Sequence, residues 1–350
     1  MITAKGYAAQ SANQELSPWN FERRDVGPHD VQIDVLFCGV CHSDIAQINN
    51  EWFPGIFPMV PGHEIVGRVV KVGDHVKGFK VGDLAGVGTL ANSCRHCAPC
   101  NDGEEVYCEN GVIPTYNGLD KYLDNQPTYG GYSNTMVSDE RFTVHIPENL
   151  DLPAVAPLLC AGITTYSPLK HWKVGKGHKL AVLGLGGLGH MAVKFGVALG
   201  AEVTILSSSP KKEADAKKLG AHHFVVTSDT EEIEKVKNSF DFILDTVSAQ
   251  HDFDFYGSLL RLNGVHIVVG IPPQGLEIKQ VFGLQLGRRS IVGSASGGLK
   301  ETQEMLDFCA VHNIVSDIEI IDIKDIKTAF ERMEKGDVKY RFVIDVASIQ

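Results

Sequence analysis

Residues 179–207 read KLAVLGLGGLGHMAVKFGVALGAEVTILS, and this stretch decides the fold of the central part of the chain. An apolar run, a glycine-rich turn, a helical pattern and a second apolar run follow one another. This order is typical of a β-strand, an α-helix and a second β-strand. Parallel strands joined by helices form a sheet that is covered on both faces. We therefore predict an α/β domain with a doubly wound parallel sheet.

The turn after the first strand carries the pattern GxGxxG at Gly184, Gly186 and Gly189. Alone this pattern is weak in a chain with 36 glycines, but a preceding strand and a following helix are the context that supports dinucleotide binding. The first glycine allows the tight turn, the second lets the backbone approach the pyrophosphate, and the third lets helix and strand pack closely. We expect Gly187 and Leu188, in the same turn, to contact the cofactor as well.

The end of the second strand indicates which nicotinamide cofactor binds. NAD sites usually carry Asp or Glu there for the ribose 2′-hydroxyl, whereas this chain has Ser207, Ser208 and Ser209, followed by Pro210, Lys211 and Lys212. A carboxylate about 4 Å from a phosphate charge costs about 4 kcal/mol at an effective dielectric constant of about 20. Hydroxyl donors and lysines instead suit an adenosine 2′-phosphate, so we predict NADP(H), with the three serines and Lys212 in the site.

Outside residues 179–207 the pattern of apolar and turn-forming residues differs. Residues 1–150 hold short Val-rich strands broken by Gly, Pro and Asp, which indicates a mostly-β region. Further strands of the parallel sheet follow at FDFILDTV and GVHIVVGI, and the chain ends with a helix and the strand KYRFVIDV. We expect a split catalytic domain, 1–154 and 292–350, around a nucleotide-binding domain, 155–291.

Composition excludes several classes of protein. A chain of 350 residues predicts two domains, and 43 % hydrophobic with 21 % charged residues is globular. The net charge of −11 lacks the basic footprint that nucleic acid and anionic membranes need. The N-terminus has no apolar segment of signal-peptide type, and no run of about 18 apolar residues could span a bilayer. We expect a soluble, cytoplasmic protein.

Four of the eight cysteines lie close together in CRHCAPCNDGEEVYC, at Cys94, Cys97, Cys100 and Cys108. In a reducing compartment such a cluster indicates a metal site and disfavours disulfides. Ferredoxins use similar CxxCxxC runs for iron–sulfur clusters, but their next cysteine usually follows after three residues and precedes proline. The longer gap here favours zinc. Four thiolates leave zinc no open position, so this is a structural site.

Catalysis by a metal needs a second, open site with three protein ligands. Cys41 in GVCHSD, His63 in PGHE and Cys160 in LLCAGITTYSP are candidates, although spacing alone does not tie them together. We interpret Cys38 and Cys309 as ordinary core residues, because a lone buried cysteine is usually inert.

The segments GVCHSD, VPGHEIVGRVV, CRHCAPC, LLCAGITTYSPL, GLGGLG and GDVKYRFVIDV together resemble the zinc-containing medium-chain alcohol dehydrogenases. Within these the chain is similar to the cinnamyl-alcohol-dehydrogenase branch of NADP-dependent aldehyde reductases, over essentially its whole length. The resemblance implies a GroES-like catalytic domain beside a Rossmann domain. It also implies two zinc ions per subunit and an aldehyde or alcohol as substrate.

By this resemblance Cys41, His63 and Cys160 are the catalytic zinc ligands, and the four clustered cysteines bind the structural zinc. Other roles follow by position. Asp44 orients His63, Glu64 can approach the zinc, and Ser43 hands on a proton. Contacts with the cofactor are expected from Thr164, Gly270 and Ile271.

The chain departs from the family in two places. Many relatives end their proton relay at a histidine where this chain has Ala46, so we expect water and the ribose hydroxyl to carry the proton. Trp52 and Ile113 are expected to line the substrate pocket, with Ala295 and Ser296 where plant relatives carry bulky side chains. A widened aromatic pocket favours aromatic and medium-chain aldehydes.

Two other interpretations stay open. In the first, the chain is a polyol dehydrogenase of the sorbitol type that works in the oxidative direction. Oxidative enzymes more often use NAD, and the absence of an acidic residue after the second strand disfavours NAD. Alternatively, it is a non-enzymatic binding or redox-sensing protein held together by the four-cysteine loop. In the family, the strand of SIVGSASGG pairs across a dimer, so a homodimer is expected.

Overall fold

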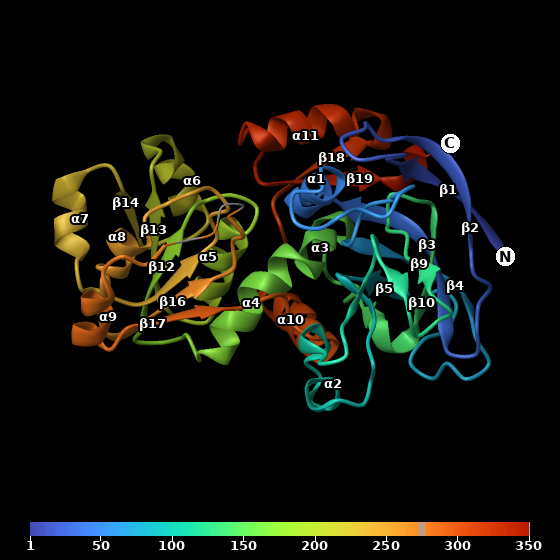
Figure 1. Cartoon of the computed structure of the whole chain (residues 1–350), viewed down its shortest axis with the longest axis horizontal. Helices are drawn as coiled ribbons and strands as arrows, with labels where there is room; N and C mark the ends of the chain where they lie inside the picture. The colour runs from blue at the N-terminus through green and yellow to red at the C-terminus, as the bar shows by residue number, and fades with distance from the viewer. Residues whose placement is uncertain (273–274, 276, 350) are drawn as a thin grey trace. The chain divides into compact units, whose positions relative to one another are not determined.

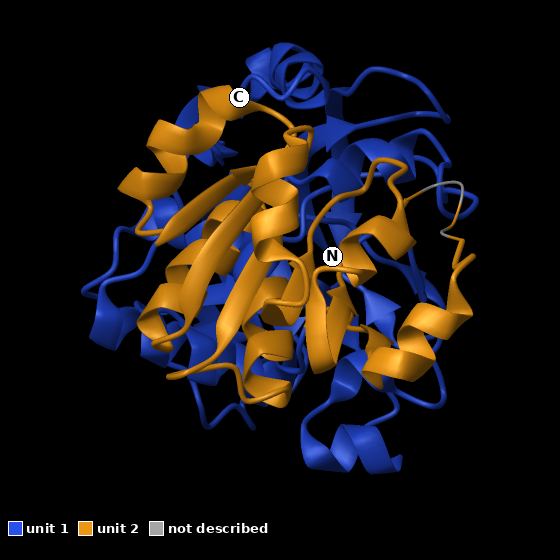
Figure 2. Ribbon diagram, turned by 90° about the vertical axis from the view of Figure 1, so that its left-hand side faces the viewer, with its two compact units in different colours: residues 1–163, 297–350 blue, residues 164–296 orange. Residues whose placement is uncertain are grey.

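The computed structural model describes residues 1–272, 275 and 277–349. They form two compact units, residues 1–163 with 297–350 and residues 164–296 (Figure 2). The domain limits expected from the sequence, at 154/155 and 291/292, remain a prediction. Among the described residues, no single helix is long and apolar enough to cross a membrane. One bent pair, Leu152–Leu159 with Ala161–His171, meets that length and composition only when its two parts are taken together.

The unit of residues 164–296 is built on a six-stranded parallel sheet, in the order β14-β13-β12-β15-β16-β17. Because the order reverses at β12, right-handed crossovers place the helices on both faces, as Figure 1 shows for α5 and α8. The predicted doubly wound sheet is confirmed. Its elements are β12 (Lys179–Leu183), α5 (Gly189–Ala198), β13 (Glu202–Ser207), α6 (Glu213–Lys218), β14 (His223–Val226), α7 (Thr230–Val236), β15 (Phe240–Asp245), α8 (Phe253–Gly257), β16 (Leu260–Val268), α9 (Val281–Gly287) and β17 (Ser290–Gly293).

The central strand β12 explains why this sequence forms a covered sheet. Its residues 180–183 are all buried, which is the continuous apolar pattern of a strand with helices on both sides. Helix α5 packs directly on this strand at Gly196, where a Cβ would lie 2.8 Å from a Leu180 methyl carbon. The apolar run in β12 and the small residue in α5 together bring helix and strand close.

The other unit is mostly β. Its main sheet runs β11-β5-β4-β3-β19-β18, and β10 also pairs with β3. All of these pairs are antiparallel except β18 with β19. The elements before the parallel sheet are β1 (Ile2–Ala8), β2 (Ser17–Arg23), β3 (Asp30–Gly39), α1 (His42–Ile48), β4 (Ile65–Val72), β5 (Leu84–Val87), β6 (Leu90–Asn92), α2 (Ala98–Asp102), β7 (Ile113–Pro114), β8 (Leu119–Asp120), β9 (Gln126–Pro127), β10 (Thr135–Asp139), β11 (Val144–His145), α3 (Leu152–Val155) and α4 (Ala161–His171), whose last residues belong to the other unit.

The C-terminal segment completes this second sheet. It contributes α10 (Leu299–His312), β18 (Ile318–Asp322), α11 (Ile326–Glu334) and β19 (Arg341–Asp345). Strand β19 pairs with the end of β3, with Val343 opposite Gly39 and Ile344 opposite Cys38. Phe342 and Ile344 lie in the same apolar core as Ile33 and Ile65. This pairing brings Arg341, at the start of β19, to the residues that follow β3.

Candidate active site

Cys41, His63, Glu64 and Cys160 meet in one buried cluster, within the unit of residues 1–163 and 297–350. One ligand atom of each lies within 4.8 Å of those of the others. Cys41 precedes helix α1, and Cys160 lies between the turn at Ala156–Leu159 and helix α4. The two Sγ atoms are 3.9 Å apart although 119 positions separate the residues in sequence. The structure thus brings together the three dispersed residues that were expected to act as one set.

Asp44 contacts both Cys41 and His63 and so helps to fix their positions in this cluster. Its Oδ2 accepts hydrogen bonds from the Cys41 backbone N–H and from the Tyr132 hydroxyl, each at 2.9 Å. Its Oδ1 lies 3.5 Å from Nδ1 of His63. A carboxylate in this position fixes the orientation of a ligand histidine and leaves Nε2 for the metal. The ring of Tyr116 stacks on His63 at a centroid distance of 5.7 Å and restrains it further.

A buried ion pair lies beside the cluster. Arg341 donates a hydrogen bond to Oε1 of Glu64, and both side chains are buried. Burial raises the pKa of Glu64 to about 7, although the charge of Arg341 opposes this. Oε2 of Glu64 has no hydrogen-bond partner among the described residues. One oxygen of Glu64 is thus neutralised by Arg341 and the other is left for a cation at the cluster.

The two thiols of the cluster differ: the hydrogen bond with Cys41, together with burial, raises the pKa of Cys160 well above its usual value, whereas Cys41 is prepared for deprotonation. The hydrogen bond with Cys160, together with the charges of Arg341 and His63, lowers the pKa of Cys41 well below its usual value. Ser43 Oγ lies 3.4 Å from Cys41 Sγ, in hydrogen-bond contact. Because the thiolate is the form that binds metals, these groups favour metal binding at Cys41.

The four clustered cysteines form a second, separate group around the short helix α2. Sγ of Cys94 is 3.9 Å from that of Cys100, and Sγ of Cys97 is 3.9 Å from that of Cys108. Backbone N–H groups point at these sulfurs, as in the hydrogen bond from Cys97 N to Cys94 Sγ at 3.4 Å. The loop therefore holds its four thiols close together around a common centre.

Both groups fit a zinc ion. Zn–S bonds of about 2.3 Å in a tetrahedron place two sulfurs about 3.8 Å apart, whereas a disulfide needs about 2.05 Å. The separations of 3.9 Å in both groups match the former. Two cysteines and a histidine leave a position open on the metal, whereas four cysteines close it. The dispersed group therefore suits catalysis and the clustered group suits a structural role.

The glycine-rich turn has the geometry that the sequence predicted. Gly184 adopts φ +90°, which L side chains rarely allow, and a Cβ on Gly189 would lie 2.2 Å from the Gly184 carbonyl oxygen. At Gly186, by contrast, a Cβ would meet nothing within 4 Å. The first and third glycines are thus required by the fold, and the second leaves space above the turn. This open space beside the start of α5 fits the pyrophosphate of a dinucleotide.

The polar segment after β13 lies close to the same turn. Nζ of Lys212 donates a hydrogen bond to the Leu185 carbonyl oxygen at 2.9 Å. Ser207 is buried and its Oγ accepts a hydrogen bond from Ser209 N at 3.2 Å, whereas Ser208 is exposed. The positive charge of Lys212 and the exposed hydroxyl of Ser208 therefore lie where an adenosine 2′-phosphate is expected. No acidic side chain stands among residues 207–212.

The remaining predicted residues lie in both units. Thr164 is half-buried in α4, Gly270 is buried after β16, and Ile271 is exposed. Trp52 is half-buried and Ile113 is buried, both in the mostly-β unit, whereas Ala295 and Ser296 belong to the other unit. A common substrate pocket for these four residues remains a prediction. Ala46 is buried and carries no titratable group, and His42 is exposed.

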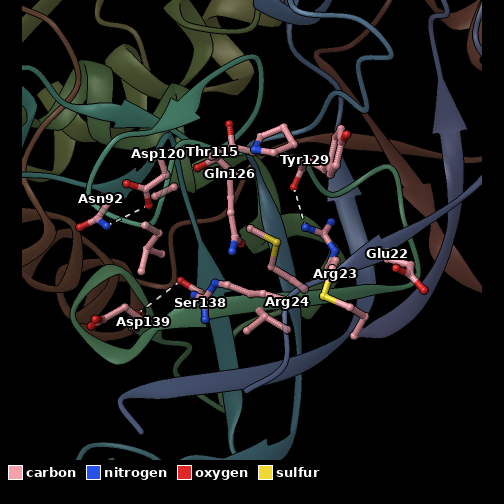
Figure 3. A pocket seen from close by; sticks show the side chains of 17 residues that line it. Glu22, Arg23, Arg24, Asn92, Thr115, Asp120, Gln126, Tyr129, Ser138 and Asp139 are labelled. Atoms are coloured by element: carbon pink, nitrogen blue, oxygen red, sulfur yellow. Dashed lines mark hydrogen bonds between the residues drawn. The ribbon is translucent and has the colours of Figure 1, made fainter. Parts of the chain in front are cut away.

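A cavity of about 310 Å³ lies elsewhere in the mostly-β unit, between β2, β9 and β10 (Figure 3). Several of its charged groups already have partners within the protein. Arg24 pairs with Asp30, and Asp120 accepts a hydrogen bond from Asn92 at 2.9 Å. These paired charges therefore serve the fold.

Arg23, at the edge of this cavity, supports the cluster of Cys41, His63 and Cys160 indirectly, through the loop that carries Tyr132. It donates hydrogen bonds to the carbonyl oxygens of Tyr129 at 2.9 Å and Gly130 at 2.8 Å, and to Ser133 Oγ at 2.8 Å. Figure 3 shows its guanidinium group directed at Tyr129. Burial lowers the pKa of Arg23 to about 9. The loop that it holds carries Tyr132, the residue that donates to Asp44.

Sequence reasoning missed three residues of the candidate site: Arg341, Tyr132 and Tyr116. Arg341 had one usable signal, because a charged residue opens the otherwise apolar strand RFVID. The tyrosines carry no signal of their own, since a buried tyrosine is ordinary in a core.

Comparisons with known proteins agree with this architecture. The family model described as alcohol dehydrogenase GroES-like domain matches residues 27–148, and the model described as zinc-binding dehydrogenase matches residues 187–311. These matches confirm the predicted fold class.

Individual relatives match the whole chain. The chain is similar to NADP-dependent alcohol dehydrogenase C 1 of Mycolicibacterium smegmatis, with 51 % identity over 100 % of both chains. It is also 52 % identical to a probable mannitol dehydrogenase of Fragaria ananassa, over 99 % of this chain and 96 % of that protein. Among solved structures, cinnamyl alcohol dehydrogenase of Sorghum bicolor superposes with a TM-score of 0.96 at 45 % identity, covering 100 % of this chain and 99 % of that one. From its motifs, its two cysteine-containing clusters and these matches, the chain belongs to the zinc-containing alcohol dehydrogenase family.

Proposed function

We propose that this protein is a zinc- and NADP(H)-dependent alcohol dehydrogenase that interconverts alcohols with aromatic or medium-chain aldehydes. The observation that carries the proposal is the buried cluster of Cys41, His63 and Cys160, backed by Asp44. The relative named NADP-dependent alcohol dehydrogenase C 1 supports both the activity and the cofactor. When bound, the zinc supplies a Lewis acid for the substrate oxygen and NADP(H) supplies or accepts a hydride.

The residues of the chain divide this work among them. Cys41, His63 and Cys160 hold the catalytic zinc, and Asp44 keeps the imidazole of His63 turned toward it. Oε1 of Glu64 accepts a hydrogen bond from Arg341, and Oε2 has no partner among the residues that the structure describes. Oε2 is therefore available to interact with a cation at the cluster. Cys94, Cys97, Cys100 and Cys108 hold the structural zinc.

A proton must reach the substrate oxygen in the reductive direction. The half-buried Ser43 is the hydroxyl closest in sequence to Cys41, and it touches that thiol. Ala46 cannot continue the path, because it has no titratable group. Beyond Ser43, the ribose hydroxyl of a bound cofactor and water would be the groups available to carry the proton.

The cofactor contacts follow from the second unit. The turn 184–189 receives the pyrophosphate, and residues 207–209 with Lys212 receive the 2′-phosphate. Thr164, Gly270 and Ile271 complete the contacts toward the nicotinamide. We place this domain at residues 155–291 and the split catalytic domain at 1–154 and 292–350. A cytoplasmic location agrees with the eight cysteines, none of which forms a disulfide in the described residues, because a reducing compartment keeps thiols reduced.

The substrate class is tested with a panel of aldehydes. Oxidation of NADPH is followed at a fixed enzyme concentration with cinnamaldehyde, benzaldehyde, hexanal and acetaldehyde, and each assay is repeated with NADH. We expect the largest kcat/KM for the aromatic or medium-chain aldehydes with NADPH, because Trp52 offers an aromatic surface and Ala295 and Ser296 are small. A preference for acetaldehyde would show that this assignment of the pocket is wrong.

The relative named probable mannitol dehydrogenase favours a second candidate, a polyol dehydrogenase. Mannitol and sorbitol are therefore assayed in the oxidative direction with NADP and with NAD. Turnover of polyols above that of cinnamyl alcohol would favour this candidate. A binding protein without activity would turn over none of these compounds, although it would still bind zinc.

We further propose a homodimer formed through the edge of the parallel sheet. Strand β17 ends the sheet order, and an edge strand presents backbone groups for pairing with another chain. Helix α9, just before it, exposes large apolar side chains, with Phe282 69 % and Leu286 70 % exposed. Unpartnered apolar surface of this kind indicates an interface.

The dimer is tested by the mass of the protein in solution. Light scattering is expected to give twice the mass of the chain, and Phe282→Asp combined with Leu286→Asp should shift the protein to monomer. Val311→Asp is the matched control, because Val311 is 81 % exposed in the other unit. A wild-type monomer, or a double variant that stays dimeric, would contradict the proposed interface.

A further inference from the structure

Two histidines and an aspartate form a buried network in the nucleotide-binding unit, apart from both cysteine clusters. Oδ2 of Asp245, at the end of β15, is 2.7 Å from Nε2 of His251 and 3.0 Å from Nε2 of His266. Asp245 and His266 are fully buried, and the His251 side chain is 9 % exposed. The ring of Phe253 stacks on both imidazoles, at 4.5 Å from His266 and 5.4 Å from His251.

The network borders the glycine-rich turn. Thr246 follows Asp245 and donates from its hydroxyl to the Leu183 carbonyl oxygen at 2.8 Å, directly before Gly184. A Cβ on Gly184 would lie 2.9 Å from a methyl carbon of Val247. Residues 246 and 247 therefore pack against the start of the turn that is proposed to bind the pyrophosphate.

The same segment also touches the loop after β16. The Asp245 carbonyl oxygen accepts hydrogen bonds from Val269 N and Gly270 N, each at 3.0 Å. A Cβ on Gly270 would lie 2.3 Å from the Val247 carbonyl oxygen, so the two loops are in close contact. Asp245 thus joins three strand ends, those of β12, β15 and β16. Ligands of open α/β sheets bind at this carboxyl edge.

The position of His251 requires a charged imidazole. Its Nε2 faces the Asp245 carboxylate, and its Nδ1 is 2.8 Å from the Ala249 carbonyl oxygen. Both neighbours are acceptors, and only the doubly protonated ring can donate to both. Protonated His251 therefore closes the loop 246–251 on itself and ties it to Asp245.

Other titratable groups lie near His251, and of these the charge of Asp252 also raises its pKa. Asp252 follows it in sequence and Tyr256 faces it from α8, with a ring-centroid distance of 5.7 Å. The hydrogen bond to Asp245 raises the pKa of His251, and burial opposes this. Burial alone would raise the pKa of Asp245, but the hydrogen bonds from His251 and His266 outweigh it. Both bonds made by protonated His251 are thus present at low pH, and one of the two is lost as pH rises through its raised pKa, because the neutral ring keeps a single N–H.

We propose that His251 is a positioning residue for the cofactor: through Asp245 it holds the loop 246–251 in the shape that NADP(H) binding needs. This inference rests on the proposed function, because it assumes that the glycine-rich turn binds NADP(H). We therefore expect part of the affinity for NADP(H) to decrease as pH rises above the pKa of His251. His251 itself need not touch the cofactor.

The test compares NADPH dissociation constants of the full chain by calorimetry between about pH 6 and pH 9, a range that includes the ordinary pKa of histidine. His251→Gln keeps a donor toward Asp245 without titrating, and His251→Ala removes the donor. His223→Gln is the matched control, since His223 forms a similar pair with Glu202 at 2.9 Å on the surface of the same unit. The 2′-phosphate of NADPH also titrates near pH 6, so the wild-type values are divided by those of His251→Gln.

We expect His251→Ala to weaken NADPH binding roughly fivefold to tenfold near the lower pH, in the range usual for coupled sites. The ratio of the wild-type dissociation constant to that of His251→Gln should be below one at the lower pH and should rise toward one as pH rises, and His223→Gln should match wild type throughout. The inference is overturned if that ratio does not change with pH, or if a folded His251→Ala binds within about twofold of wild type. If His251→Ala fails to fold, the pH profile of His251→Gln decides. A wild-type chain that binds no NADPH at any pH would overturn the proposed function itself.

Discussion

Replacement of Cys160 by alanine is expected to remove one of two zinc ions and to lower kcat/KM for aldehyde reduction by about a thousandfold or more. A metal acting as a Lewis acid contributes several kcal/mol of transition-state stabilisation, and each 1.36 kcal/mol corresponds to about tenfold in rate. Without Cys160, only Cys41 and His63 remain of the three expected ligands. Elemental analysis gives the zinc content, and NADPH oxidation gives the rate.

Cys309 is the matched control for this experiment. It is buried in α10 and belongs to neither cysteine cluster. Cys309→Ala should keep two zinc ions and nearly the full activity. Circular dichroism should show that Cys160→Ala remains folded, because the four-cysteine loop is intact. Two zinc ions and undiminished activity in Cys160→Ala would refute the catalytic role of the cluster.

Replacement of Ser208 by aspartate is expected to weaken NADPH binding by about a hundredfold to a thousandfold. Two unit charges about 4 Å apart interact by about 4 kcal/mol at an effective dielectric constant of about 20, and the 2′-phosphate carries more than one charge. Ser208 is exposed, so salt screens part of this repulsion. NADH has no 2′-phosphate, and its binding should be unchanged or tighter.

Ser208→Asn is the control, because asparagine has nearly the shape of aspartate without its charge. Dissociation constants for NADPH and NADH are measured for both variants at low and at high salt. The loss in NADPH affinity should be large only for Ser208→Asp and should shrink as salt increases. Equal losses in the two variants would mean that the 2′-phosphate does not bind at this position.

Features that depend on near neighbours in the chain could be predicted from the sequence. The turn Gly184–Gly189 lies between an apolar strand and a helix, and the geometry of its glycines follows from that local order. The four cysteines of the loop 94–108 lie within fifteen positions of one another. Such a short segment brings their thiols together with little help from the rest of the fold.

The catalytic candidates Cys41, His63 and Cys160 were identified by resemblance, since their spacing does not connect them. The fold brings Cys41 and Cys160 together across 119 positions, and Glu64 and Arg341 across 277. The pairing of β19 with β3 carries Arg341 to that place. A periodic pattern predicts which face of a strand is buried, but not which distant strand pairs with it.

The sequence by itself determined the parallel sheet, the glycine-rich turn, the four-thiol loop and the absence of an acidic residue after β13. Each of these follows from interactions within one strand, one turn or one loop. Only the tertiary structure decided that Asp44 accepts a hydrogen bond from the Tyr132 hydroxyl, that Glu64 pairs with Arg341, and that the carboxylate of Asp245 contacts two histidines. These are contacts between side chains of distant segments, and their energies depend on burial and orientation that arise only when the sheets have formed.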